Sequence, residues 1–545
     1  MRFHVNLCAG LCLALTLLNS PAVAIPVAGQ PAATPVERST TDHSKLDLLK
    51  GPFKSGPEVT KACLTCHNTA GHQVMKSVHW TWETKSPTTG KMLGKKWAAN
   101  NFCGSPLSNE PRCTSCHAGY GWTDQGFDFT NQDNVDCLAC HDTTGTYKKF
   151  GTNAGHPLYA DREFEPMEGP PGKKPFKAPD LTKIAQHVGQ PGRANCGACH
   201  FSGGGGDGVK HGDLDSSLKT PSRELDVHMA KDGADMACSD CHTFNAHQPS
   251  GSRYAATARD PHGIDLPKDD RNRATCESCH GFEPHRQAKL NAHTAKVACQ
   301  TCHIPEFARG GIPTKMLWDW STAGKMGADG KPLFIKDEHG HLTYSAAKGD
   351  FSYGENVRPE YKWYNGTVQQ VTITDKLEAY IATDGVLELN RIEGSAGDPS
   401  SRIWPFKVMR GKQAYDPVND TLVVNHVFGD DDTALWKNYD YAKSIRAGME
   451  YAGLPYSGEF GFIETRMNWF ITHMVAPKEK AVPCAECHTR DATGRLAKIE
   501  GIYLPGRDRN PWIDLFGGLA IVGAIGGGLI HGLARILTRR QENKQ

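Results

Sequence analysis

The chain has 545 residues, 19 cysteines and a formal net charge of +1 at pH 7. This length predicts two to four packing units rather than one domain. The near-neutral charge excludes the basic footprint of a nucleic-acid-binding protein, so we expect no nucleic-acid partner. The cysteine content suggests disulfides or metal centres, and the cysteine spacing decides between them.

Residues 1–24 have the composition of a secretory signal peptide. A short basic start is followed by an apolar run and by a small-residue cleavage site, Ala22–Ala24. The alternative is an uncleaved anchor, but the apolar run is too short to span a bilayer. Cleavage would remove Cys8 and Cys12. Residues 25–60, rich in Pro, Ala, Thr and Lys, are expected to form an extended lead-in.

Sixteen of the remaining cysteines form eight copies of one motif, C-x-x-C-H. Two thiols three positions apart can add to the two vinyl groups of one haem, and the adjacent histidine then meets the iron. Zinc sites also use C-x-x-C pairs, but eight copies with the histidine in place favour haem. We therefore expect eight covalently bound haem c groups, on Cys63/Cys66/His67, Cys113/Cys116/His117, Cys137/Cys140/His141, Cys196/Cys199/His200, Cys238/Cys241/His242, Cys276/Cys279/His280, Cys299/Cys302/His303 and Cys484/Cys487/His488.

Seven motifs lie in residues 61–303 and the eighth in residues 484–510. So little chain per porphyrin cannot build a separate core around each haem, so the haems should pack together as the core. The connections are rich in Gly, Pro, Asn and Asp, which predicts short helices and many loops. The expected fold is a mainly α multihaem cytochrome c fold with few short strands.

Residues 304–483 carry no motif and are expected to form a lobe whose helices pack on the haem core. Alternating or β-branched stretches predict short strands, and helical spacing of apolar residues predicts two helices. The predicted strands are Thr367–Thr374, Val386–Arg391 and Thr421–Val427, and the predicted helices are Thr433–Ala452 and Glu464–Val475.

Residues 511–537 are expected to form a transmembrane helix. Leu515–Ala534 contains 20 residues without a formal charge, enough to cross a bilayer. Arginines follow immediately, which places the tail, residues 538–545, in the cytoplasm. The alternative is a buried helix of a soluble protein. With the signal peptide, this predicts a periplasmic protein anchored to the inner membrane.

A haem iron held by two histidines transfers electrons, whereas an open or weakly held position permits catalysis. Fifteen histidines outside the motifs precede the predicted membrane helix and follow the predicted signal peptide, so counting cannot show that any iron is open. Histidines that flank motifs are the best distal candidates. They are His79, His211, His228, His247, His285, His293 and His473, with His72, His156, His187 and His262 in reserve.

From Lys61 to His488 the sequence resembles the octahaem tetrathionate reductases, within the nitrite reductase and hydroxylamine oxidoreductase superfamily. The stretches that carry the resemblance beyond the motifs are Asn101–Gly104, Asn195–Phe201, His211–Asp213, Cys299–Pro305 and His473–His488.

The resemblance implies that the haem on the second motif is the catalytic one. In the family its distal ligand is a lysine three positions after an aspartate, which Lys183 and Asp180 match. The family also places a reactive cysteine, and an asparagine three residues before it, near the substrate. Cys103, the one cysteine left over, and Asn100 match this pair.

A lysine ligand would be informative chemically. An amine must be neutral to bind iron, which costs about 4–5 kcal/mol at pH 7 for a group with an ordinary pKa of about 10.4. Such a ligand is easier to displace than imidazole. Once protonated, it is a cation beside the iron, which suits an anionic substrate.

The sequence lacks a C-x-x-C-K motif and a displaced second cysteine, which favours the tetrathionate reductase branch over nitrite and sulfite reductases. The leading interpretation is reduction of a small oxyanion, tetrathionate, to thiosulfate. Nitrite or hydroxylamine reduction at the same haem is the first alternative, and a non-enzymatic, membrane-anchored electron conduit is the second. The membrane helix implies a quinol-linked donor in the inner membrane, such as a cytochrome b.

Overall fold

The computed structural model describes residues 41–102, 104–165, 172–260 and 274–542. From His43 onward the chain forms one unit of contacts. The predicted signal peptide and residues 25–40 of the predicted lead-in lie outside the described residues, as do Cys103 and His262.

The haem motifs lie on or at the ends of short helices, as the loop-rich sequence predicts. A cysteine pair at i and i+3 needs about one helical turn to present both sulfurs on one face. The motif helices are α2 (Gly56–Leu64), α5 (Glu110–Cys113) with η3 (Thr114–Cys116), α6 (Leu138–His141), α8 (Arg193–His200), α9 (Cys238–Cys241), α10 (Glu277–His280), α12 (Cys299–His303) and α15 (Cys484–Cys487).

Further short elements connect these helices. The helices are α3 (Ala70–Val74), α4 (Val78–Thr81), α7 (Leu181–Gln186) and α11 (Ala288–His293), with 3₁₀ turns η1 (His43–Lys45), η2 (Asp47–Leu49), η4 (Gln132–Asn134) and η5 (Ser216–Lys219). The two-stranded ribbons pair β1 (Thr84–Lys85) with β2 (Met92–Leu93), β3 (Arg162–Phe164) with β4 (Lys174–Phe176), and β5 (Phe244–Asn245) with β6 (Gln248–Pro249).

The haem-free lobe is built on a nine-stranded sheet, so the expectation of few short strands is wrong there. Its path runs β13-β17-β15-β7-β10-β9-β8, and β11 and β16 also pair with β15. The lobe strands are β7 (Thr314–Asp319), β8 (Phe334–Lys336), β9 (Leu342–Ser345), β10 (Gly349–Gly354), β11 (Glu360–Tyr364), β12 (Val368–Gln370), β13 (Leu387–Glu388), β14 (Asn390–Ile392), β15 (Arg402–Asp416), β16 (Thr421–Leu422) and β17 (Gly461–Phe470), and β12 pairs with β14 outside the sheet. The lobe also holds the 3₁₀ turns η6 (Trp320–Thr322), η7 (Glu378–Tyr380) and η8 (Lys478–Lys480).

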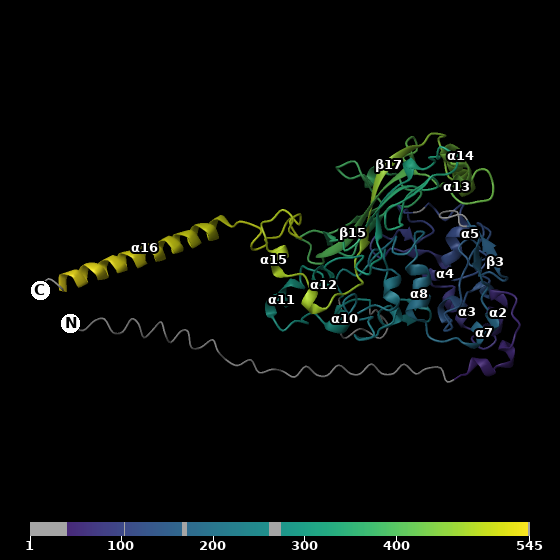
Figure 1. Cartoon of the computed structure of the whole chain (residues 1–545), viewed down its shortest axis with the longest axis horizontal. Coiled ribbons are helices and arrows are strands. Elements are labelled where there is room, and N and C mark those ends of the chain that lie inside the picture. Colours follow the sequence, from purple (N-terminus) through teal and green to yellow (C-terminus); the bar gives the residue numbers. More distant parts are fainter. Residues whose placement is uncertain (1–40, 103, 166–171, 261–273, 543–545) are drawn as a thin grey trace. The chain divides into compact units, whose positions relative to one another are not determined.

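Strand β17 replaces the helix predicted over Glu464–Val475. It pairs antiparallel with β15 from Phe406 opposite Phe470 to Tyr415 opposite Gly461 (Figure 1). Thr465, Met467 and Trp469 are all buried, which is the period of two expected of a strand. In so short an apolar segment, pairing with a long neighbouring strand outweighs local propensity.

The helix predicted over Thr433–Ala452 is two helices, α13 (Leu435–Asn438) and α14 (Tyr441–Ala452). Tyr439 between them adopts a left-handed conformation, with φ of 59°, which ends the first helix. Asp440 then starts the second, because its side chain accepts a hydrogen bond from the Lys443 backbone N–H.

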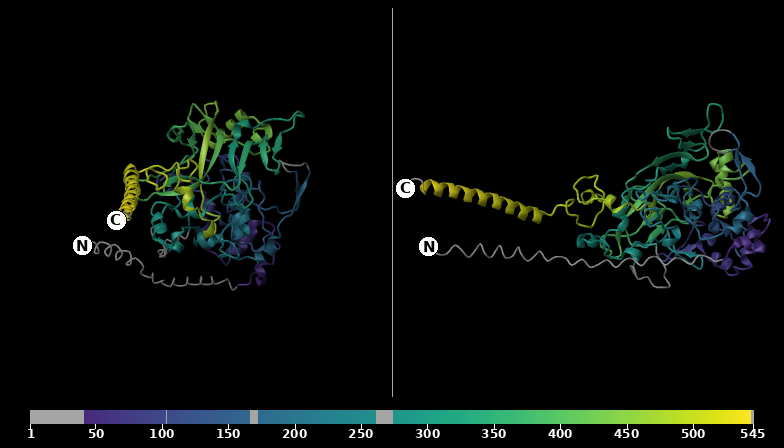
Figure 2. Two further views of the ribbon diagram at one scale, coloured as in Figure 1. Left: turned by 60° about the vertical axis from the view of Figure 1, so that its left-hand side comes forward. Right: turned by 60° about the horizontal axis from the view of Figure 1, so that its bottom comes forward.

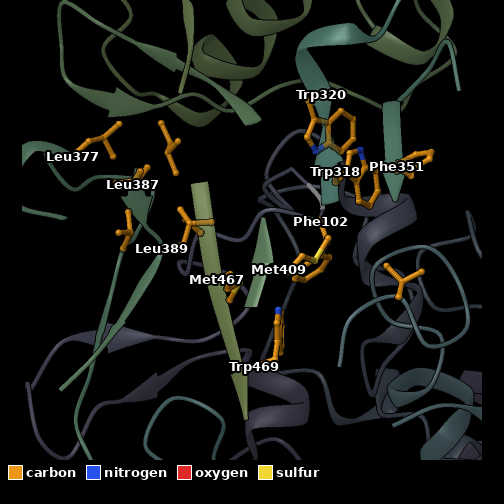
Figure 3. Packing of buried hydrophobic residues seen from close by; sticks show 14 residues of the cluster. Phe102, Trp318, Trp320, Phe351, Leu377, Leu387, Leu389, Met409, Met467 and Trp469 are labelled. Atoms are coloured by element: carbon orange, nitrogen blue, oxygen red, sulfur yellow. The ribbon is translucent and has the colours of Figure 1, made fainter. Parts of the chain in front are cut away.

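The largest apolar cluster joins the sheet to the haem-bearing segment. Phe102 packs at a tilt against Trp469 of β17, with ring centroids 5.6 Å apart (Figure 3). The same cluster contains Trp318 and Trp320, whose rings stack at 4.7 Å. The sheet thus holds the loop that carries Asn100 and Phe102, directly before Cys103.

The chain ends in one long helix, α16 (Pro511–Glu542), drawn in yellow in Figure 2. Its stretch Pro511–Arg540 is long and apolar enough to cross a membrane, and an 18-residue window within it has a mean hydropathy of 1.9. None of the side chains in this apolar stretch is buried by the rest of the chain.

Candidate haem-binding and active sites

Seven of the eight motif histidines lie opposite a second histidine. The centroids of the two imidazole rings are 6.0 to 6.4 Å apart in every pair. The pairs are His67 with His43, His141 with His247, His200 with His79, His242 with His473, His280 with His228, His303 with His285, and His488 with His293.

This spacing fits two imidazoles on opposite faces of one iron. A metal–imidazole bond is about 2.0–2.1 Å long and the ring centre lies about 1.1 Å behind the nitrogen, so two ligands of one iron have ring centres about 6.3 Å apart. The motif cysteines beside them are free thiols, as haem attachment requires. The donor sets therefore fit haem c.

Five of the sixteen motif cysteines are not covered by the rest of the chain, which fits the expectation that haems form the core. They are Cys66, Cys116, Cys140, Cys279 and Cys484, whereas the other eleven are half-buried. The physical reason is that a thiol bonded to a haem vinyl group must face the porphyrin, so protein side chains cannot cover it. The lack of covering side chains at these cysteines is therefore compatible with covalent attachment of haem.

Cys66 and Cys279 are two exposed motif thiols with a hydroxyl donor beside the sulfur. Their sulfurs contact only adjacent hydroxyls, those of Thr65 and Ser278, each at 3.8 Å among the hydrogen bonds of the described residues. Protein side chains do not enclose either sulfur. Their attachment to haem stays a prediction, supported by the motif spacing and by the paired histidine that follows each of them.

Hydrogen bonds orient the paired rings. Nδ1 of His141 donates to the Gly189 carbonyl at 2.8 Å, and Nδ1 of His488 donates to the Pro505 carbonyl at 2.7 Å. With Nδ1 held in this way, Nε2 is left to face the partner ring. His242, His247, His285, His293 and His473 also have Nδ1 hydrogen bonds.

The structure brings six of the seven predicted distal histidines opposite a motif histidine. The exception is His211, whose ring packs against Trp469 at 4.8 Å. The seventh partner is His43, which the sequence reasoning missed because it lies in the predicted lead-in. Sequence proximity also misjudges partners: His247 follows the fifth motif but faces His141 of the third.

Sulfurs of different motifs lie side by side, which gives the order of the sites. Direct thiol contacts join the first motif to the third, the second to the fourth, the fourth to the fifth, and the sixth to the seventh. Electrostatic neighbours join the third to the fourth, the fifth to the sixth and the seventh to the eighth. The sites therefore form one series, 1-3-4-5-6-7-8, with the second beside the fourth.

His117 of the second motif differs from the other motif histidines. It is only 1% exposed and, among the described residues, no second histidine ring faces it. Its Nε2 lies 2.7 Å from the Trp80 carbonyl, whereas its Nδ1 is buried without a hydrogen-bond partner. The aromatic rings around it belong to Trp80, Trp82, Trp122, Phe127 and Phe129.

Burial in this aromatic cage lowers the pKa of His117 to about 3, so the ring is neutral at pH 7. Positive charge gathers next to it. The thiol pKa of Cys116 is held well below its usual range, first by the neighbouring Cys199 thiol and further by the charges of Lys95, Lys149 and Lys210. The second motif is thus the one without a paired imidazole among the described residues, and three lysine charges act on its Cys116 thiol.

Lys149 is the amine in closest contact with the second motif. It donates to the His117 and Gly119 carbonyls and pairs with the buried Asp136 at 3.0 Å. Tyr120 and Tyr147 donate to the same carboxylate at 2.7 and 2.8 Å. A buried network of hydrogen-bond donors around one carboxylate therefore adjoins His117, and burial raises the pKa of Tyr120 and of Tyr147 well above the usual range.

The residues that the resemblance assigns to the active site lie on two elements. Asp180 caps α7, because its carboxylate accepts from the Lys183 backbone N–H at 3.0 Å. The Lys183 side chain is exposed, and α7 packs against η1, η2 and α2. No described contact joins Lys183 or Asp180 to the second motif.

A small cavity that is open to solvent lies between the loop of Asn100 and Gly104 and the sheet. Asn100 and Gly104 line it, with Gln413 and Asn425 also in its lining. Gln413 donates to the Asn100 carbonyl at 2.7 Å, while its own side-chain oxygen is buried without a partner. The sheet thereby supports this loop from one side.

A solved structure shows the same overall organisation. The octahaem cytochrome c from Shewanella oneidensis is 43% identical to this chain, with a TM-score of 0.72, and the match covers 85% of this chain and 97% of that one. This chain belongs to the octahaem cytochromes c. Residues 315–491 also match the family model described as "Cytochrome c bacterial". No curated protein matches.

Membership means that this octahaem cytochrome carries covalently bound haem c and has an electron-transfer or other redox role. It also indicates a location outside the cytoplasm. The haem supplies an iron that accepts or gives one electron at a time. The chain supplies what surrounds each iron, namely paired imidazoles at seven motifs and a different environment at the second.

The histidine pairs predict opposite outcomes for two substitutions. His43→Ala should convert one low-spin haem into a high-spin haem, because it removes the ring facing His67. His211→Ala should leave the wild-type spin states unchanged, because His211 faces Trp469 rather than a motif histidine. Electron paramagnetic resonance on proteins with full haem content measures both. High-spin haem in His211→Ala and none in His43→Ala would contradict the pairing.

Proposed function

We propose that all eight motifs carry haem and that the chain is a reductase whose chemistry takes place at the second motif. Seven irons would then be bis-histidine relay centres. The observation that carries the proposal is His117, which lacks the second imidazole that every other motif histidine has among the described residues. A pure electron conduit gives no reason for this difference.

The series of sites supports a route for electrons. The eighth motif lies nearest in sequence to α16, and the second motif adjoins the fourth. Electrons from a membrane donor would pass through motifs 8, 7, 6, 5 and 4 to the second. In Figure 1 the helices α15, α12, α10 and α8 follow one another in that order.

Tetrathionate is the substrate that the surroundings of the second motif suit best. Its two-electron reduction breaks the central S–S bond of one dianion and releases two thiosulfate dianions, with no proton consumed. Two further negative charges therefore develop as the bond breaks. The ammonium groups of Lys95 and Lys210, whose charges act on the Cys116 thiol, would stabilise that charge.

Reduction of nitrite or hydroxylamine at the same site is the second candidate. Those reactions consume protons, and the network of Asp136, Tyr120, Tyr147 and Lys149 beside His117 could deliver them. Both candidates use the same haem, so kinetics must separate them.

The resemblance assigns Lys183 as the weakly held ligand, oriented by Asp180, with Cys103 and Asn100 near the substrate. We keep that assignment as part of the proposal. Lys149 is the natural comparison, because its amine already contacts the second motif through the His117 carbonyl.

We expect the highest kcat/KM for tetrathionate in steady-state assays that also include nitrite and hydroxylamine. Lys183→Ala should lower kcat for tetrathionate about 100-fold or more, the loss typical of removing one preorganised group at a reacting centre. It should also change the spectrum of one haem. Lys149→Ala is the comparison variant, and it should keep the wild-type haem spectrum even if the loss of its ion pair with Asp136 lowers kcat.

Wild-type spectra and activity in Lys183→Ala would contradict the assignment of Lys183 as the distal ligand of the second haem. If Lys149→Ala alone changes one haem spectrum, the ligand is Lys149 instead. If tetrathionate is not turned over while nitrite or hydroxylamine is, the second candidate replaces the first.

We further propose that the chain is exported and anchored in the inner membrane by α16, with its haems in the periplasm. The length and hydropathy of Pro511–Arg540 support this, as do Arg535, Arg539 and Arg540 at its C-terminal end. An anchored relay suits a quinol-linked donor such as a cytochrome b.

Truncation after Asn510 tests the anchor. The shortened protein should move from the membrane fraction to the soluble fraction and keep dye-linked activity, because the haem motifs all precede the cut. It should lose quinol-linked activity in membranes. Recovery of the full-length chain in the soluble fraction without detergent would contradict the anchor.

A further inference from the structure

One buried carboxylate faces the ring of a paired histidine. Asp213 is fully buried, and its Oδ2 lies 3.2 Å from Nδ1 of His473. The same oxygen accepts the backbone N–H of Thr472 at 2.7 Å and of His473 at 2.9 Å. The carboxylate is therefore held firmly against the ring that lies opposite His242 of the fifth motif.

The hydrogen-bond partners of the other paired rings are neutral. Backbone carbonyls accept from His141, His242, His293 and His488, and side-chain amides accept from His247 and His285. The nearest comparable acid is Asp226, whose oxygen is 4.0 Å from Nδ1 of His228, too far for a hydrogen bond. Among the described paired rings, a carboxylate hydrogen bond is found at His473.

A buried lysine lies near Asp213. Lys407 is fully buried, which lowers its pKa well below the usual range, and the charge of Asp213 opposes that shift. Its Nζ donates to the Val209 carbonyl at 2.9 Å, to the Lys210 carbonyl at 3.0 Å and to the Thr314 hydroxyl. The amine therefore bonds to oxygens other than those of Asp213, whose Oδ2 faces His473.

A carboxylate at Nδ1 draws the ring proton towards itself and makes Nε2 a stronger donor to a metal. A stronger donor stabilises the ferric state over the ferrous state and so lowers the reduction potential. Burial strengthens the effect, because the low dielectric around Asp213 screens its charge poorly.

We propose that Asp213 is a positioning residue that makes the haem on the fifth motif a low-potential step in the relay. This rests on the proposed relay through motifs 6, 5 and 4. Reduction adds one electron to the iron, from ferric to ferrous, and the Nδ1 proton stays between the ring and the carboxylate. Electrons would therefore reside on either side of this haem rather than on it.

Asp213→Asn tests the proposal, because it keeps an acceptor oxygen and removes the charge. In redox titrations of the whole haem-loaded protein, one midpoint potential should rise while the others stay. The expected change in the equilibrium constant for reduction is about tenfold, or about 59 mV for a one-electron couple. Asp213→Glu should return that potential towards the wild-type value.

Asp215→Asn is the matched control. Asp215 is also fully buried and two residues away, but its carboxylate accepts from the Ser217 backbone N–H. It should leave all midpoint potentials unchanged. The reciprocal variant, Asn291→Asp, puts a carboxylate beside His285 and should lower the potential of the haem on the seventh motif.

Unchanged potentials in Asp213→Asn with full haem content would overturn the proposal, as would an equal shift in Asp215→Asn. If Asp213→Asn fails to load its haems, the Asn291→Asp variant decides: the proposal is overturned if its seventh-motif potential does not fall. The potentials are read without substrate, so this outcome is separate from the success or failure of the reductase assignment.

Discussion

The structure depends on pairs of imidazole rings whose separation leaves room for one iron between them. The two rings of a pair often come from segments distant in sequence, such as His79 with His200, His242 with His473, and His293 with His488. Motif helices of four to nine residues are too short to be stable alone in water. Iron bound between two such rings would link these segments. It would thereby stabilise short helices that the small apolar clusters alone cannot hold in place.

The sheet lobe has two roles in this arrangement. Its cluster around Phe102 and Trp469 holds the loop before Cys103 against the haem-bearing segment. The same strand that supplies Trp469, β17, ends at Phe470, three residues before His473. One strand thereby supports both the predicted active-site loop and a ligand of the relay, together with the Asp213 carboxylate that faces it.

The eight attachment motifs could be predicted because their chemistry is local: two thiols and a histidine within five residues. The partner of each motif histidine is not local. Flanking position indicates His247 and His473, but the fold places them opposite the third and fifth motifs. His43 could not be found this way, because its segment has the composition of a linker. The strand β17 has a period-two pattern that is visible in hindsight, but only its pairing with β15 distinguishes it from a helix.

The sequence and the fold identify different parts of the proposed active site. Resemblance supplies Lys183, Asp180, Cys103 and Asn100, whose roles no local pattern could reveal. The geometry independently sets the second motif apart, through the aromatic cage and the unpaired ring of His117.

The central claim is that seven haems are bound by two histidines and one is not. Near-infrared magnetic circular dichroism of the oxidised, haem-loaded protein tests it most directly, because the ligand-to-iron charge-transfer bands differ between axial ligand sets. The account predicts bis-histidine intensity equivalent to seven haems and a separate contribution from one. Intensity equivalent to eight bis-histidine haems, with no other component, would contradict it.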